Sequence, residues 1–305
     1  MKTLALIIVL SFFAGVAFAQ DTLPDLPMGV EAQSLFGENL TSPKSSMALL
    51  ANYESAKVTF DADPYDVDNI IWYGRRVAYL GRYREAIEIY SKGLKENPND
   101  ARLYRHRGHR YISIREFDRA IEDFEKAAAL IEDMENEVEP DGVPNLLGIP
   151  ISSLHGNIFY HLGLSYYLKQ DWENALRAYR NGFNSSRNDD NRVSTTYWIY
   201  LILLRMERPG EAQEALDVIS KNMTIIENMS YHQLCLLYKG EIEIEDMMDA
   251  NANNPTNAAV AYGIANWYYY NGNDEKANEV LNNILEGASW ASFGFIAAEA
   301  DMVNK

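Results

Sequence analysis

The sequence has little cysteine, with a single one among 305 residues. An intramolecular disulfide is therefore impossible, and packing alone must stabilise the fold. Cys235 stands within the apolar stretch Leu234–Leu237, so we expect a buried, unreactive thiol.

Positive charge is also scarce and unevenly placed. The 27 Lys and Arg residues face 44 Asp and Glu, for a formal net charge of −17, which argues against nucleic acid as the main partner. Residues 75–119 nevertheless hold twelve bases and six acids, whereas residues 211–305 hold four bases and fifteen acids. This asymmetry predicts a basic surface in the N-terminal half and an acidic one in the C-terminal half.

Signatures of catalysis and of metal binding are missing. The sequence has no nucleophile elbow, no glycine-rich phosphate loop and no paired-carboxylate pattern. His106 and His109 stand three residues apart, but no Cys, Asp or Glu completes a ligand set at fixed spacing. We therefore expect no enzyme activity, no catalytic residue, no metal and no cofactor.

The first residues indicate export. Lys2 precedes the apolar run Leu4–Phe13, and Ala17-Phe18-Ala19 is typical of a signal-peptide cleavage site. We predict a signal peptide over residues 1–19, with an uncleaved anchor as the alternative. No second apolar span follows, so the cleaved chain would not span a membrane, and the scarcity of cysteine favours a bacterial periplasm or cell surface. Residues 20–44 hold three prolines and no periodicity, which predicts a flexible leader.

One sequence period dominates the rest of the chain. The spacing from Gly74 to Gly108 recurs in three further pairs of small or aromatic residues, namely Ala86 and Ala120, Tyr90 and Phe124, and Gly93 and Ala127. A fixed period of this length, about 34 residues, is the mark of stacked helical hairpins.

These residues resemble the tetratricopeptide repeat family. Gly74, Tyr83, Ala86, Tyr90 and Pro98 match the small, aromatic and closing positions of one unit, and a second unit follows. The resemblance implies an all-α, right-handed superhelical solenoid of stacked helix-turn-helix hairpins. We expect an N-terminal capping helix within residues 45–66, two units over 67–134, further and partly degenerate units over 156–288, and a C-terminal capping helix over 289–305.

The first helix and the insertion between the second and third units each allow a more specific prediction. We expect Ser45 or Ser46 to cap the first helix, with Met47, Leu50, Tyr53 and Val58 on its apolar side. Residues 135–155 break the period with prolines and glycines, so we expect an irregular insertion that either binds a partner or braces a groove wall.

The resemblance also implies where a partner would bind. The first helix of each unit lines a concave groove, and the matching positions here provide four polar anchors, namely Arg75, Arg102, Arg105 and His109. Tyr79, Tyr160 and Tyr167 would supply apolar contact. Guanidinium groups recognise carboxylates through paired charge-assisted hydrogen bonds, which suits an acidic peptide or protein. The alternative is that these arginines form a solvated, internally paired face.

We therefore expect an exported interaction module that binds a protein or peptide on a concave groove whose N-terminal half is basic, which suits an acidic partner. A carbohydrate- or nutrient-binding protein of the cell envelope is one alternative, suggested by the aromatic content and by export. A hydrolase is the other, and it would need a polar pocket near His155, His161 and the insertion.

Overall fold

The computed structural model describes residues 23–251 and 258–304. Its regular elements are two short strands and a succession of helices: β1 (Ala32–Gln33), β2 (Asn39–Leu40), α1 (Met47–Ala62), α2 (Val67–Tyr79), α3 (Tyr83–Glu96), α4 (Ala101–Ser113), α5 (Phe117–Leu130), α6 (Leu154–Leu168), α7 (Trp172–Asn184), α8 (Asp189–Arg205), α9 (Pro209–Ala215), the 3₁₀ turn η1 (Leu216–Val218), α10 (Met229–Tyr238), α11 (Ile244–Asn251), α12 (Ala258–Tyr270), α13 (Asp274–Leu285) and α14 (Phe293–Val303). The predicted signal peptide lies outside the described residues.

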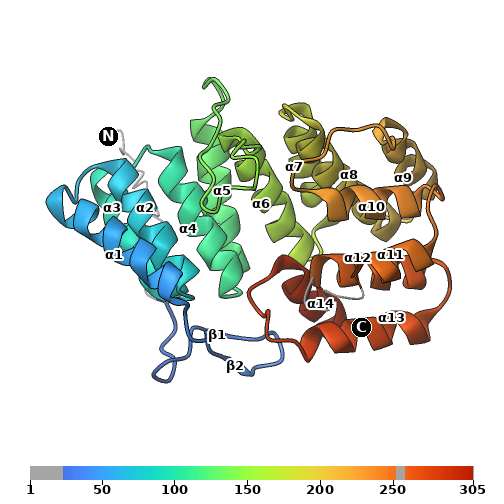
Figure 1. The fold of residues 1–305 in the computed structure, drawn as a ribbon, viewed down its shortest axis with the longest axis horizontal. Coiled ribbons are helices and arrows are strands. Elements are labelled where there is room, and N and C mark those ends of the chain that lie inside the picture. The colour runs from blue at the N-terminus through green and yellow to red at the C-terminus, as the bar shows by residue number, and fades with distance from the viewer. Residues whose placement is uncertain (1–22, 252–257, 305) are drawn as a thin grey trace, which may run out of the picture.

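Consecutive helices form antiparallel hairpins that stack side by side, which confirms the all-α repeat fold. α2 packs on α3, α4 on α5 and α6 on α7, and each hairpin also contacts the next. Figure 1 shows the chain running outward from α1 to α9 and returning through α10 to α14. The core lies between the hairpins, where Tyr90, Phe124, Tyr179 and Trp198 are almost completely buried.

Small residues let the two helices of a hairpin approach closely, as the period predicts. A Cβ atom added at Gly163 would lie 2.6 Å from the ring of Tyr179, and one at Gly108 would lie 2.9 Å from Phe124. Since real Cβ atoms do not come this close, each aromatic ring occupies the space that the glycine leaves free.

The turn inside each hairpin requires a left-handed backbone. The residue there has a positive φ in six successive units, at Gly81, Arg115, Gln170, Glu207, Gly240 and Gly272. A left-handed residue after a helix satisfies its last carbonyl groups and reverses the chain. The first two of these residues stand one sequence period apart. The turns therefore repeat at the same spacing as the small and aromatic packing residues.

The N-terminal end differs from expectation in two ways. Ser46 caps α1 as expected, but none of the residues of α1 is buried, and Met47 and Val58 are 80% and 70% exposed. The expected apolar side of α1 is therefore wrong at Met47 and Val58, whereas Tyr53 packs on Tyr73 of α2, because among the described residues α1 has a neighbouring helix on one side only. Within the expected flexible leader, β1 and β2 form an antiparallel hairpin, and Ala32 is buried in the core.

The C-terminal helix does more than cap the stack. α14 packs on α12 and α13 and also reaches α6, which lies far earlier in the chain. The Arg115 side chain, after α4, forms a buried ion pair with Glu299 at 2.9 Å and donates to the carbonyl of Trp290. The Trp290 indole in turn donates to the carbonyl of Thr41. These contacts join the C-terminal end to the N-terminal half and close the curved stack on itself.

The turn geometry predicts which glycine tolerates a side chain. Gly272 has φ +76°, whereas Gly210 lies in α9, and an added Cβ would meet nothing within 4 Å at either site. We expect Gly272→Ala to lower the free energy of unfolding by about 1 kcal/mol, because alanine is strained in the left-handed region. Gly210→Ala should leave stability unchanged or raise it. Urea unfolding measures the free energy of unfolding of both variants. Equal changes in the two variants would contradict the prediction.

Candidate functional site

Part of the insertion packs against α2, α4 and α6, while residues 143, 144 and 146–150 are exposed. Its two ends pair as an antiparallel bridge between Val138 and Ser153 at the start of α6. The Glu139 amide donates to the Ser152 carbonyl, and the Leu154 amide donates to the Glu137 carbonyl. This pairing holds the Glu139 side chain over α4 and α6.

The Glu139 carboxylate is buried among polar groups from these two helices. Its Oε2 atom lies 3.2 Å from the Arg105 Nε atom and accepts a 2.6 Å hydrogen bond from the Asn157 amide. Its Oε1 atom lies 3.1 Å from the Nε2 atom of His106. We call these four residues (Arg105, His106, Glu139 and Asn157) the carboxylate clamp.

Charge within the clamp follows from its contacts. Burial alone would raise the pKa of Glu139, but the Arg105 guanidinium and hydrogen bonds from His106 and Asn157 lower it below its usual range. Burial, together with the neighbouring Arg105 charge, lowers the pKa of His106 to about 3. Since Arg105 can only donate, the His106 Nδ1 atom accepts its 3.0 Å hydrogen bond, and the proton of the neutral ring is on Nε2, facing Glu139.

The next residues of the insertion contact α2. The Arg75 guanidinium donates to the Pro140 carbonyl at 2.9 Å, and Arg76 donates to the Gly142 carbonyl at 2.8 Å. Gly142 itself lies so close to Tyr79 that an added Cβ would overlap the phenol. Basic residues of α2 and α4 therefore hold an extended acidic segment of the chain itself.

The predicted partner-binding residues fall into three groups. Arg75, Tyr79 and Arg105 meet at the insertion, as just described. Arg102 lies apart from them, 41% exposed, and pairs with Asp68 and Asp100 at 2.7 Å each. His109, Tyr160 and Tyr167 lie farther along the concave side and do not contact the clamp carboxylate.

These last three residues have different exposures. The His109 ring is half-buried against His161 and Phe293, at centroid distances of 4.4 and 5.4 Å. Tyr167 is buried, and its hydroxyl is 2.7 Å from that of Tyr262, which donates to Asp301. A partner could not reach Tyr167 in this arrangement. The binding roles of all seven residues stay a prediction.

Tyr160 borders an open cavity of about 300 Å³ beside the insertion. Its hydroxyl lies 2.9 Å from that of Tyr231 and accepts a hydrogen bond from the Trp198 indole. Serine, threonine and asparagine side chains from α6 and α8 complete the wall, with Phe293 of α14 opposite. The cavity offers aromatic surface, neutral hydrogen-bonding groups and the Glu227 side chain next to the clamp, in which the charge of Arg105 is balanced by Glu139.

Sequence reasoning missed Glu139 and His106 as members of the site and did not count Asn157 among the polar anchors. The motif Val138-Glu139-Pro140-Asp141-Gly142 gave a signal for an irregular segment but none for its contact with Arg105 on α4. Asn157 occupies a groove-lining position of its unit, so the resemblance could have identified it. Among residues 23–251 and 258–304, no group of three or more His, Cys, Asp and Glu is arranged to hold a metal ion.

The comparisons with known proteins agree with this architecture. Residues 158–181, within α6 and α7, match the family model described as tetratricopeptide repeat. This segment is similar to a tetratricopeptide repeat, and the match does not extend beyond it. In the series of hairpins seen in Figure 1, this matched segment is the third unit of the stack. The likeness supports a protein-interaction scaffold of the tetratricopeptide type.

Individual relatives are distant. The BBSome complex member BBS4 of Bos taurus is 24% identical over 161 residues, 53% of this chain, and the chain spans only about a quarter of that protein, 26% of its length. The structure of the APC/C hetero-tetramer Cut9-Hcn1 superposes with a TM-score of 0.51 at 14% identity, covering 79% of this chain and 44% of that one. YrrB, described as a TPR protein with an unusual peptide-binding site, gives a TM-score of 0.44 at 18% identity, covering 82% of this chain and 99% of that one.

In the part of the chain that the structure describes, no helix is both long and apolar enough to cross a bilayer.

Buried histidines make the stability of this site sensitive to acid. Burial and the Arg105 charge lower the pKa of His161 to about 3, as for His106, whereas each histidine titrates near 6.5 when unfolded. Between these pH values the unfolded chain binds the extra protons, so stability is complete above pH 6.5 and is lost as pH falls. Each histidine costs about 1.4 kcal/mol per pH unit in this range.

We therefore expect His106 and His161 together to lower the free energy of unfolding by about 3 kcal/mol between pH 6.5 and pH 5, and His109, whose pKa burial also lowers, to add to this loss. Urea unfolding at several pH values measures it. In His161→Asn, the free energy of unfolding should fall less steeply with decreasing pH, because one of the histidines that gain a proton on unfolding is absent. Stability that is constant over this interval would show that His106 and His161 protonate in the folded protein.

Proposed function

We propose that this chain is an exported, non-catalytic interaction module that binds an acidic peptide or protein segment on its concave face, mainly through the basic N-terminal half. The observation that carries the proposal is the carboxylate clamp. Arg105, His106 and Asn157 surround one carboxylate, and Arg75 adds a donor to the neighbouring backbone carbonyl. This set of donors suits an extended acidic segment, whether it comes from the insertion or from a partner.

A partner would compete with the insertion. The tethered Glu139 has an effective concentration on the order of millimolar, so a free peptide must exceed that concentration or gain contacts that the insertion does not make. The cavity at Tyr160 provides such contacts, because it is open beside residues 151–153 of the insertion. In this proposal, a partner places its carboxylate in the clamp and an aromatic or aliphatic side chain in the cavity.

Removing the internal competitor tests this proposal. We expect Glu139→Ala to bind a fluorescent peptide with the sequence of residues 135–145 at least about tenfold more tightly than the unmodified chain does. The physical reason is that Arg105 is left buried without its counter-charge and gains most from a new carboxylate. Fluorescence anisotropy measures the affinity.

Two controls separate the clamp from general attraction. A peptide with glutamine in place of the glutamate that corresponds to Glu139 should bind Glu139→Ala weakly, because it brings no charge. Arg177→Glu combined with Glu139→Ala should keep most of the affinity, since Arg177 of α7 pairs with Glu125 away from the clamp. Equal binding of both peptides would refute the clamp as a recognition site.

Export is proposed from residues 1–19 alone. Cleavage after Ala19 would give a mature chain that begins at Gln20. Intact-mass measurement of the protein from a periplasmic or surface fraction checks this expectation. A chain that retains residues 1–19 would contradict cleavage and favour an anchor. The comparisons give no support to the carbohydrate-binding and hydrolase alternatives.

A further inference from the structure

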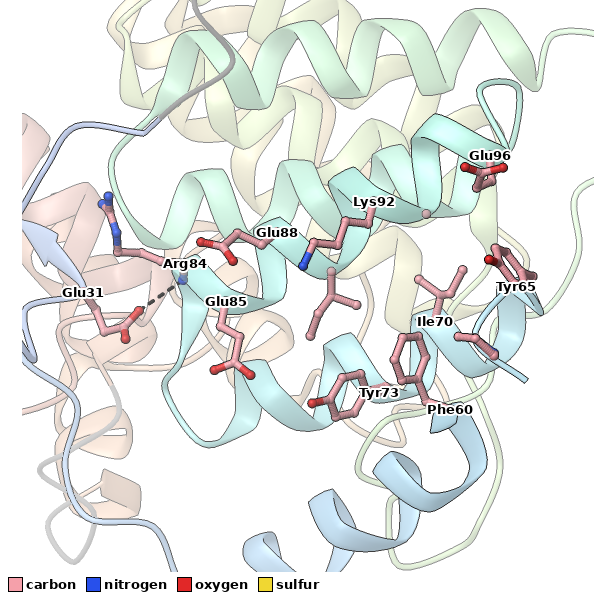
Figure 2. Close-up of a pocket in the computed structure, with 13 residues that line it drawn as sticks. Glu31, Phe60, Tyr65, Ile70, Tyr73, Arg84, Glu85, Glu88, Lys92 and Glu96 are labelled. Atoms are coloured by element: carbon pink, nitrogen blue, oxygen red, sulfur yellow. Dashed lines mark hydrogen bonds between the residues drawn. The ribbon is translucent and has the colours of Figure 1, made fainter. Parts of the chain in front are cut away.

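A second hollow lies at the N-terminal end of the stack, between α1, α2 and α3. It has a volume of about 820 Å³ and extends from Glu31, near β1, to Tyr65 and Glu96 at the far end. Figure 2 shows Glu31 and Arg84 at one end, Tyr65 and Glu96 at the other, and the remaining labelled side chains between them. We call this hollow the trough. It shares no residue with the carboxylate clamp.

The floor of the trough is apolar. Phe60 of α1 stacks on Tyr73 of α2 at a centroid distance of 4.7 Å, and Ile70 and Ile89 extend this surface. Figure 2 shows Phe60, Ile70 and Tyr73 grouped on one side, facing the side chains of α3. Among residues 23–251 and 258–304, no other helix covers this surface, in which Ile70 and Tyr73 are buried and Phe60 and Ile89 are half-buried. An apolar partner face would exclude water from it.

The rim of the trough is acidic. Glu31, Glu85, Glu88 and Glu96 line it, against Arg84 and Lys92. Glu85 pairs with Arg82, and the Glu31 carboxylate accepts from the Arg84 amide at 3.1 Å. Glu88 and Glu96 are exposed and form no ion pair or hydrogen bond with the described residues. The Arg84 guanidinium is turned toward the Pro24 carbonyl, so it does not neutralise them.

We propose that the trough is a docking surface for an amphipathic helix of a partner protein, with an apolar face for the floor and Lys or Arg residues for the rim. Glu85 and Glu96 lie near the two ends of α3, a separation that corresponds to about 16 Å or roughly three helical turns. A helix of that length fits between α1 and α3 as other helices of the stack fit between their neighbours. Glu88 and Glu96, which form no ion pair with the described residues, favour a partner helix with positively charged residues on either side of its apolar face.

This partner differs in kind from the one proposed for the concave face. The clamp and Arg75 select negative charge, whereas the trough selects positive charge together with apolar side chains. The two surfaces lie on opposite sides of α2, since Arg75 and Tyr79 face the insertion and Ile70 and Tyr73 face the trough. A failure of either proposal therefore leaves the other untouched.

The test uses the full chain and a fluorescent model peptide of about twelve residues, with leucines on one helical face and lysines beside them. We expect Glu88→Lys combined with Glu96→Lys to weaken binding at least about tenfold. The matched control is Glu122→Lys combined with Glu132→Lys. It changes the net charge equally, and Glu122 occupies the position in the second unit that Glu88 occupies in the first.

The control should change affinity by less than about twofold, and circular dichroism should show the bound peptide becoming helical. Equal weakening in both double variants would overturn the proposal, because it would show general attraction to an acidic protein. The trough is also the wrong site if Ile89→Asn leaves the affinity unchanged. Concentration-dependent dimerisation of the unmodified chain that Glu88→Lys with Glu96→Lys abolishes would assign the trough to a second copy instead.

Discussion

The burial of the Glu139 carboxylate is the constraint on which the concave face depends. A buried carboxylate is costly unless charged and hydrogen-bonding groups surround it, and here the insertion, α4 and α6 must all be in place to provide them. The neutral state of His106 is part of the same arrangement, since its proton faces Glu139 and its other nitrogen accepts from Arg105. Moving the insertion would therefore leave Arg105 buried without a counter-charge.

A second constraint closes the stack. A solenoid normally contacts only its neighbours along the chain, but here the buried pair between Arg115 and Glu299 joins residues 184 positions apart. Trp290 extends this contact to Tyr83 and to the carbonyl of Thr41. On the concave side, Phe293 lies beside His109 and His161. The C-terminal helix thus forms one wall of the cavity at Tyr160, so closure and the candidate site depend on each other.

Periodic features of this structure were predictable from the sequence, and contacts between distant segments were not. Gly108 and Phe124 recur with the period and were placed correctly, because repeated packing leaves a repeated pattern. The exposure of α1 and the burial of Tyr167 depend on what lies next to each helix in space. Tyr167 has a groove position, but Tyr262 and Asp301 cover it when the chain returns. Contacts of this kind occur once and leave no periodic signal.

The first unit presents opposite charges on its two sides. Arg75 and Arg76 of α2 point toward the insertion, while Glu85, Glu88 and Glu96 of α3 border the trough. The two surfaces lie on opposite sides of α2, and at physiological ionic strength the attraction of exposed charges reaches only about 8 Å, so each surface acts mainly on the partner that approaches it. This separation of charge shows how a chain with a net charge of −17 can place Arg75 and Arg76 together on one side of its first unit. It also means that overall charge does not predict which partner the chain selects.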